Sequence, residues 1–428
     1  MITWERSKNA ILNGNSLLSK SPDSILPGLW PSHFERAKGC HVETTGGHRY
    51  LDFSNMGVGS CILGYAIEEI DKAVGEVINK GVMSSLNCAE EVDLAETLLR
   101  IDSWAGKVRF ARTGGEALSI AVRLARAATN RSKIIISGYH GWHDWYLAAN
   151  LKSTDKLNGY LIPGLTPKGV PPELEGLTYV HDLVDLEALR GVLQKRETAA
   201  VVMEVARFSG PDRQLLQKIR DICNETLTLL IFDECTSGFR ETLGGMHAGS
   251  GVSPDLCTYG KAIANGYALT AITMTEKVAQ DSAGVFISST FWTERIGPAA
   301  ALATISFLNR HKVPDAIRQK GIFLRERLES MFKSEEVNFS IIGLNSLPCF
   351  YSEDGSDRVA ITKLLLEKDI LFSGTVYLSY AHDDEYLEHF IDQMTEAVRT
   401  LKTFTPHEKA EFVSHHMPQF RLGRITSR

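Results

Sequence analysis

The chain has 428 residues, of which 43% are hydrophobic and 23% charged, a composition typical of a soluble globular protein with room for one large α/β domain and a smaller one. Its formal net charge of −6 offers no basic surface to DNA or RNA, so we expect no nucleic-acid partner. The longest apolar runs, such as LTLLIF, are too short to span a bilayer, and the N-terminal stretch lacks the pattern of a secretory signal. We therefore expect no membrane partner.

Seven cysteines are scattered singly, at positions 40, 61, 88, 223, 235, 257 and 349. Their odd number and their spacing match neither a disulfide framework nor a C-x-x-C metal site. The sequence therefore predicts a protein of the reducing cytoplasm that binds no metal.

Helical and strand patterns alternate from about residue 50 to residue 310. Apolar residues at helical spacing, such as Leu94, Leu98 and Ile101, predict helices, and short apolar runs predict buried strands. This alternation favours a mostly parallel sheet covered on both faces, an α/β fold. The expected helices are 90–101, 116–128, 185–194 and 213–223, and the expected strands are 107–111, 133–137, 199–204 and 227–234.

The C-terminal part of the chain has a different pattern. A charged stretch follows residue 310, then short strands and a final helix at 385–401, which predicts a smaller α+β domain. The polar tail, 407–428, is expected to pack loosely.

Glycines follow the strand at 107–111, in the text RTGGEA. In parallel α/β sheets, ligands bind at the carboxyl ends of the strands. Gly114 and Gly115 would let backbone N–H groups approach an anion at the start of a helix, and Thr113 could donate its hydroxyl. A plain turn is the alternative.

Aromatic, imidazole and acidic side chains follow other strands. Tyr139 could stack on a planar ring, and His140 or His143 could be a base or a packing group. Glu204 ends the strand at 199–204, and Asp233 ends the next. A carboxylate at the end of an apolar strand needs a partner: a protonated ring nitrogen, a helix N-terminus or a salt bridge.

Lys261 stands in the small, apolar turn YGKAIANG, where no long polar face carries its charge. Taken alone, the segment also fits a turn lysine whose ammonium reaches water. A phosphate cradle, a stacking aromatic ring, an aspartate for a pyridinium nitrogen and a lysine for a Schiff base together make a pyridoxal 5'-phosphate (PLP) site. Burial would lower the pKa of such a lysine and free its amine to react.

Three stretches resemble the class III aminotransferases, fold type I PLP enzymes, and within them the glutamate semialdehyde aminomutase branch. These stretches are LLIFDECTSGFR, PDLCTYGKAIANGYALTA and TGGEALSIAVRLARAATNRSKIIISGYHGWHD. The resemblance covers roughly residues 25–400. It implies a large PLP-binding domain at 51–310 and a small domain at 311–428, with the N-terminal segment 1–50 packing against the small domain.

The resemblance also implies roles for individual residues. Lys261 would form the Schiff base and move the substrate proton, and Asp233 would keep the pyridine nitrogen protonated. Tyr139 and Cys235 would lie on the two faces of the ring.

Further residues of the family site complete the set. Gly114 and Gly115 would bind the phosphate together with Thr290 of a neighbouring subunit, so the active sites would be shared across a homodimer. Glu204 would lie near the cofactor. The cofactor-binding set also includes Thr113 and His140.

The sequence departs from the aminomutases where they hold the substrate carboxylate, because PGLWPSHF contains no arginine. This favours an aminotransferase acting on an amino donor and a carbonyl acceptor, conceivably a sugar or a biosynthetic intermediate, with the 2,1-aminomutase as the alternative. Arg240 and Arg295 could clamp a carboxylate or form salt bridges.

A dinucleotide-binding enzyme and a non-catalytic protein of the same fold are the alternative classes. A dinucleotide-binding enzyme is disfavoured, because the glycines of NMGVGSCILG do not form G-x-G-x-x-G. A non-catalytic protein of the same fold would not need Lys261.

Overall fold

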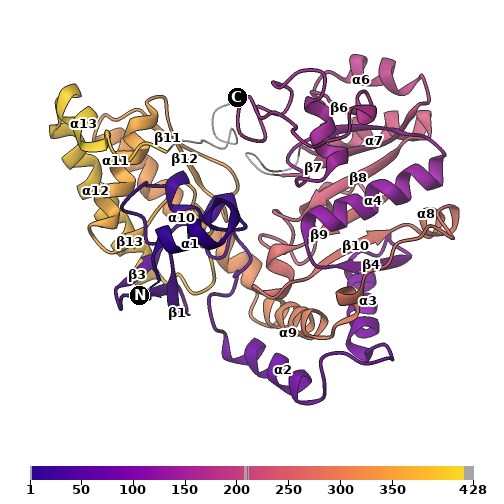
Figure 1. Cartoon of the computed structure of the whole chain (residues 1–428), viewed down its shortest axis with the longest axis horizontal. Helices are drawn as coiled ribbons and strands as arrows, with labels where there is room; N and C mark the ends of the chain where they lie inside the picture. Colours follow the sequence, from indigo (N-terminus) through magenta and orange to yellow (C-terminus); the bar gives the residue numbers. More distant parts are fainter. Residues whose placement is uncertain (1, 207–209, 211, 419–428) are drawn as a thin grey trace. The chain divides into compact units, whose positions relative to one another are not determined.

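The computed structural model describes residues 2–206, 210 and 212–418. Contacts divide the chain into two compact units (Figure 1). Among the described residues, the large unit spans 69–314, and the small unit combines 2–68 with 315–418. This combination confirms the prediction that the N-terminal segment and the C-terminal part form one smaller unit. The domain limits 1–50, 51–310 and 311–428 stay a prediction.

A seven-stranded sheet forms the centre of the large unit, in the order β4, β10, β9, β8, β7, β5, β6. All neighbouring pairs are parallel except the two that β10 makes, so the sheet is mostly parallel as predicted. The sequence did not predict the reversed β10, since a buried strand is a continuous apolar run in either direction. The strands are β4 (Lys107–Ala111), β5 (Lys133–Ser137), β6 (Thr178–Val180), β7 (Thr198–Glu204), β8 (Leu229–Glu234), β9 (Leu256–Tyr259) and β10 (Thr270–Met274).

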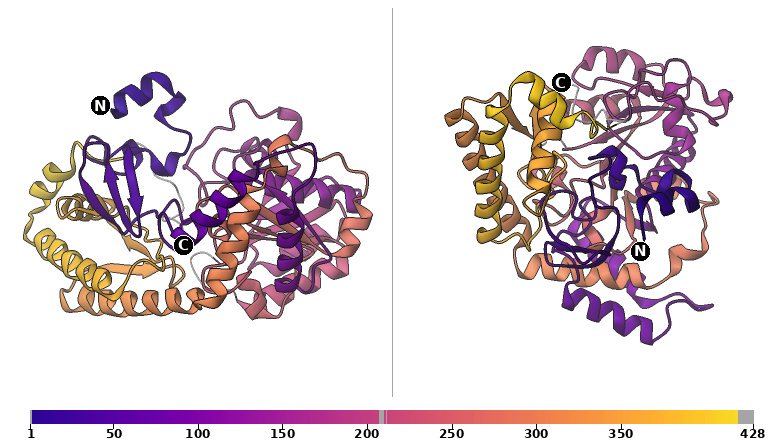
Figure 2. Two further views of the ribbon diagram at one scale, coloured as in Figure 1. Left: turned by 90° about the horizontal axis from the view of Figure 1, so that it is seen from below. Right: turned by 60° about the vertical axis from the view of Figure 1, so that its left-hand side comes forward.

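Helices cover both faces of this sheet (Figures 1 and 2). In α4 (Gly114–Thr129), the buried stripe with Leu118 and Val122 packs against Ile134 and Ile231 of the strands. Within the described residues, no helix is both long and apolar enough to cross a bilayer. The other helices are α2 (Glu68–Asn79), α3 (Ala89–Ile101), α5 (Asp144–Leu147), α6 (Leu186–Leu193), α7 (Arg213–Thr226), α8 (Glu276–Asp281) and α9 (Ile296–Arg310).

The small unit has a four-stranded sheet, ordered β1, β2, β3, β13, and a hairpin of β11 and β12. Aromatic rings fill its interior: Phe53 stacks on Phe390 with ring centroids 4.3 Å apart, and Phe372 lies 5.9 Å from Phe390. Its elements are α1 (Trp4–Ala10), β1 (Phe34–Lys38), β2 (His41–Thr44), β3 (Arg49–Asp52), α10 (Val313–Ser334), β11 (Phe339–Ile342), β12 (Cys349–Ser352), α11 (Gly355–Leu366), β13 (Ile370–Leu371), α12 (Asp384–Thr403) and α13 (Pro406–Val413).

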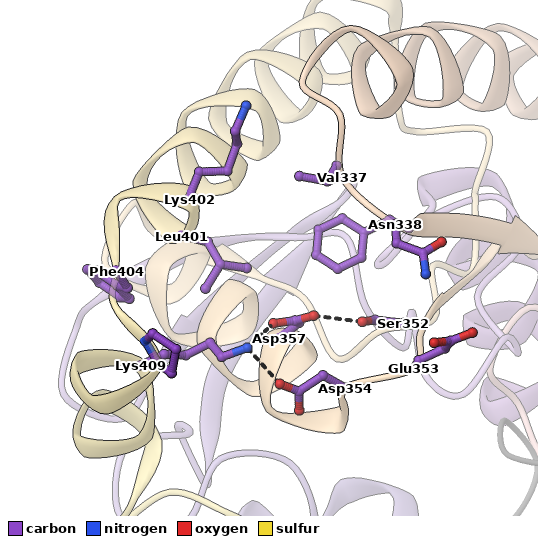
Figure 3. A pocket seen from close by; sticks show the side chains of 12 residues that line it. Val337, Asn338, Ser352, Glu353, Asp354, Asp357, Leu401, Lys402, Phe404 and Lys409 are labelled. Carbon is purple, nitrogen blue, oxygen red and sulfur yellow. Dashed lines mark hydrogen bonds and ion pairs between the residues drawn. The ribbon is translucent and has the colours of Figure 1, made fainter.

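The C-terminal region is better anchored than its composition indicated. Nζ of Lys409 in α13 lies 2.6 Å from a carboxylate oxygen of Asp354 and 2.8 Å from one of Asp357, at the start of α11 (Figure 3). A pocket of about 400 Å³ lies beside this contact. The expectation that the tail packs loosely is therefore wrong for residues 407–413, which belong to α13. Residues 419–428 lie outside the described part of the chain.

Candidate functional site

The sheet register brings the predicted strand-end residues to one edge of the sheet. Glu204 pairs with Asp233 across β7 and β8, and Asp233 pairs with Thr258 across β8 and β9. Ser137, two residues before Tyr139, pairs with Met203, the residue before Glu204. Because these strands run in parallel, their carboxyl ends meet, and the turns that follow them are neighbours.

Asp233 is buried and carries hydrogen bonds on both oxygens. One oxygen lies 2.9 Å from Nδ1 of His140, and the other accepts from the backbone N–H of Cys235 at 3.0 Å and the hydroxyl of Thr258 at 3.4 Å. Burial would raise the pKa of Asp233, but the hydrogen bond and charge of His140, with the nearby charge of Lys261, outweigh it and lower this pKa. The carboxylate is therefore held ionised inside the protein.

His140 is also buried, and within the described residues its Nε2 has no hydrogen-bond partner. A buried nitrogen without a partner is the kind of atom that a bound molecule or a water satisfies. The sequence left His140 open as base or packing group. Its bond to Asp233 shows that it orients this carboxylate.

Lys261 follows β9 and begins the 3₁₀-helical turn Lys261–Ala264. Its φ of +46° lies in the left-handed region, which costs a side-chain-bearing residue about 1–2 kcal/mol. Nζ donates a hydrogen bond to Oγ1 of Thr236 at 2.9 Å, and the next residues, Ala262 and Ile263, are fully buried. Backbone strain of this kind is concentrated at functional sites.

Tyr139 is positioned through its backbone. Its N–H donates to Oε2 of Glu204 at 3.0 Å, and its ring meets Tyr146 edge-on at a centroid distance of 6.0 Å. The preceding Gly138 has a φ of +131°, and a Cβ there would lie 2.8 Å from the Glu204 side chain. Glu204 therefore fixes the turn that presents the tyrosine ring.

The RTGGEA turn is the start of α4. Thr113 is the N-cap and forms a capping box with Glu116, so its hydroxyl serves the helix. The N–H groups of Gly114 and Gly115 begin the first turn, where backbone donors have no acceptor within the helix. A Cβ on Gly115 would come within 3.0 Å of the His143 ring. The turn therefore offers backbone N–H groups, and at Gly115 a larger residue would crowd His143.

Cys235 and Thr290 differ in their surroundings. Cys235 is buried, its Sγ lies 3.7 Å from the hydroxyl of Thr258, and burial keeps the pKa of its thiol well above the usual range. The thiol therefore acts as a small apolar group. Thr290 is exposed, in the 3₁₀ turn Thr290–Thr293.

The two arginines named as possible carboxylate clamps are bonded within the protein. Nη2 of Arg295 lies 2.5 Å from Oε1 of Glu90, and this bond raises the pKa of Arg295. Arg240 is fully buried, and its Nε donates to the backbone oxygen of Thr236 at 2.7 Å. For Arg295, the structure favours the salt-bridge alternative.

Sequence reasoning missed three residues of this site. Thr236 contacts Lys261, Thr258 contacts Asp233, and Glu116 caps the helix that begins at the glycines. A signal existed only for Glu116, whose spacing from Thr113 is that of a capping box. Thr258 lies in a strand and Thr236 in a turn, and neither stretch of sequence has a pattern that marks a functional hydroxyl.

Residues 29–374 match the family model of the class-III aminotransferases. The chain belongs to the class-III aminotransferase family. The 3-aminobutyryl-CoA aminotransferase of Cloacimonas acidaminovorans is 32% identical over 422 residues, covering 94% of this chain and 97% of that protein. A 2'-deamino-2'-hydroxyneamine transaminase of Streptomyces kanamyceticus is 31% identical, with coverage of 91% and 97%. A glutamate-1-semialdehyde 2,1-aminomutase of Hyperthermus butylicus is 30% identical, with coverage of 87% and 93%.

Solved structures share the fold of this class-III aminotransferase. The PLP-containing FumI protein of Sphingopyxis sp. MTA144 matches with a TM-score of 0.84 at 23% identity, covering 94% of this chain and 97% of that one. An omega-transaminase from Sphaerobacter thermophilus matches with a TM-score of 0.81 at 24% identity, with coverage of 93% and 97%. The predicted fold type I is therefore confirmed, as are the family and the PLP-dependent aminotransferase class.

The residues of this class-III aminotransferase fit the cofactor of its family. An ionised, buried carboxylate suits a protonated ring nitrogen, and helix-start N–H groups between small residues suit a phosphate. A strained lysine near that carboxylate suits covalent attachment.

Proposed function

We propose that Lys261 binds the aldehyde of PLP through Nζ and that the enzyme uses this attachment to move an amino group between an amino donor and a ketone or aldehyde. The observation that carries the proposal is the position of Lys261. It stands in a left-handed turn, Thr236 holds its amine, and it lies near enough to Asp233 to lower the pKa of that carboxylate.

Each neighbouring residue then has a chemical task. Asp233, oriented by His140, accepts a hydrogen bond from the protonated ring nitrogen, and Tyr139 and Cys235 contact the ring faces. PLP supplies an electron sink for the substrate carbon and carries the amino group. Lys261 moves the proton at that carbon.

Two tasks remain for the other residues of the site: binding the phosphate and fixing the turn that carries Tyr139. The N–H groups of Gly114 and Gly115 bind the phosphate at the start of α4, where Thr113 caps the helix. Glu204 keeps the Tyr139 turn in place.

We also propose a cytoplasmic homodimer with shared active sites. Thr290 is exposed and serves the phosphate of the neighbouring subunit. Exposed apolar side chains nearby, Phe286 and Phe291, give this region the character of a protein interface. Seven free cysteines support a reducing compartment.

The test is covalent labelling with PLP. Purified protein supplied with PLP should become yellow, and borohydride should bleach the colour and leave a pyridoxyl group on the Lys261 peptide. Lys261→Ala should remove the label, whereas Lys277→Ala, at an exposed lysine of α8, should not. Protein that stays colourless, or a label on another lysine, would overturn the proposal.

The 2,1-aminomutase reaction is a second candidate, supported by aminomutase relatives such as the 30% identical protein of Hyperthermus butylicus. An aminomutase converts glutamate-1-semialdehyde without a second substrate. An aminotransferase stops at the half-reaction until a carbonyl acceptor is added. Product analysis with and without an acceptor therefore separates the two.

A further inference from the structure

Residues 286–295, here called the arginine-bound segment, follow α8 and precede α9. Residues 285–289 form neither helix nor strand. Guanidinium groups of three arginines, which lie in β4, just after β4 and in α4, donate to the backbone oxygens of the segment. The bonds join Arg109 to Ile287, Arg112 to Trp292 and Glu294, and Arg123 to Phe286.

Arg112 makes the densest set of these contacts. Its Nη2 donates to the backbone oxygens of Trp292 at 3.1 Å and Glu294 at 2.8 Å, and lies 3.0 Å from Oε1 of Glu294. The Glu294 carboxylate in turn accepts from the N–H of Ile296 at 2.7 Å, at the start of α9. Both charged side chains are largely buried, so water screens their interaction less than at the surface.

Glu116 joins the segment to the glycine turn. Its Oε2 accepts from the N–H groups of Arg112 at 3.0 Å and Thr113 at 2.8 Å. Its Oε1 accepts from Nε1 of Trp292 at 3.2 Å. One carboxylate therefore holds the N-terminus of α4 with one oxygen and the arginine-bound segment with the other.

Packing and polar bonds both attach the segment. Ile287 and Trp292 pack against the hydrophobic core that includes α4. A pocket of about 220 Å³ beside α4 is lined among others by Ser119, Phe286 and Trp292, so the atoms that face it forgo some dispersion contacts. The bonds of Arg112 and Glu116 add direct restraints between the segment and the start of α4.

We propose that Arg112 and Glu116 are positioning residues that fix Thr290 to the strand–helix junction carrying Gly114 and Gly115. Each subunit then binds its own cofactor phosphate through its glycines and binds the cofactor phosphate of the partner subunit through Thr290. The bonds of Arg112 and Glu116 hold these two phosphate-binding elements in a fixed relative position. The proposal rests on the role of Thr290 in the proposed function. Arg112 and Glu116 need not touch either phosphate.

The first experiment measures the dissociation constant of PLP by absorbance titration of the apo-homodimer. Arg112→Gln should weaken PLP binding about tenfold, the size of one hydrogen bond to a charged group. Arg131→Gln is the matched control, because Nη1 of Arg131 also donates to backbone oxygens, those of Thr198 in β7 and Thr226 in α7. Equal affinity of the two variants would overturn the proposal. If Arg112→Gln fails to fold, Trp292→Phe, which removes the indole N–H bonded to Glu116 and keeps an aromatic ring, should show a smaller loss.

The second experiment uses mixed dimers in which one chain carries Lys261→Ala, so that a single covalent site remains. Arg112→Gln placed in the Lys261→Ala chain should weaken PLP binding at the partner's intact site. The proposal would be overturned if Arg112→Gln weakened PLP binding only when it is placed in the chain that keeps Lys261. Thr290→Val in the Lys261→Ala chain tests the proposed function separately. If Thr290→Val leaves PLP binding unchanged, the proposal of a shared active site is wrong. If Thr290→Val weakens PLP binding and Arg112→Gln in the same chain does not, only the proposed positioning role of Arg112 is wrong.

Discussion

The Nζ atom of Lys261 donates a hydrogen bond to Oγ1 of Thr236 at 2.9 Å. Thr236 is itself fixed, because its backbone oxygen accepts from Nε of the fully buried Arg240 at 2.7 Å. The amine that we propose binds PLP therefore has a defined direction set by the residues after β8.

Removing this hydroxyl should slow covalent loading of the enzyme. Thr236→Val keeps the shape of the side chain but leaves the amine without that bond, which is worth about 0.5–1.5 kcal/mol. We expect the rate of PLP attachment, followed by stopped-flow absorbance, to fall by up to about tenfold. Thr236→Ser should restore most of it. A wild-type rate in the valine variant would show that the bond has no role in attachment.

Gly115→Ala should weaken PLP binding without unfolding the protein. The added Cβ would come within 3.0 Å of His143 at the proposed phosphate site, so either the ring or the helix start must move. We expect a loss of affinity of about tenfold, or 1.4 kcal/mol, in a PLP titration. Gly191→Ala in α6 is the control: its Cβ meets nothing within 4 Å, and it should raise stability by about 0.5–1 kcal/mol.

Acid should destabilise the large unit through Asp233. The pKa of this carboxylate is lowered in the folded protein, so its stabilising contribution is present above its ordinary value of 3.8 and is lost as pH falls through the lower folded value. Asp233→Asn should cost about 3 kcal/mol at pH 7. The difference in Tm between wild type and variant should shrink below about pH 4. A constant difference would mean that Asp233 is not ionised when folded.

Lys409→Met should loosen α13. The hydrogen bond from Lys409 to Asp354 is the main cause that lowers the pKa of Asp354 to about 2 (Figure 3). The ion pair therefore contributes fully above pH 3.8 and is lost as the pH falls towards 2. Because Asp354 is half exposed, we expect a loss of only about 0.5 kcal/mol. Amide exchange in residues 406–413 should accelerate at neutral pH. Lys277→Met, at another surface ion pair, should leave that exchange unchanged.

The sequence predicted the layered large unit well, because buried strands and amphipathic helices differ in period. It also predicted the strand-end positions of Asp233 and Lys261, since a parallel sheet gathers its carboxyl ends. It could not predict the Lys261–Thr236 bond, which depends on the course of two turns. Nor could it predict that Arg295 pairs with Glu90, because an arginine near a site looks the same whether it meets a substrate or a neighbouring acid.

The reversed direction of β10 has a geometric result. Thr270, at its start, pairs with Ala111 at the end of β4, and the hydroxyl of Thr270 donates to the backbone oxygen of Thr113 at 3.4 Å. Residues 262–269 therefore connect Lys261 to a residue that is held beside the glycine turn, and their length helps to set the distance between the two. We expect an inserted residue there to alter the distance between Lys261 and the glycine turn, the span that we propose PLP bridges.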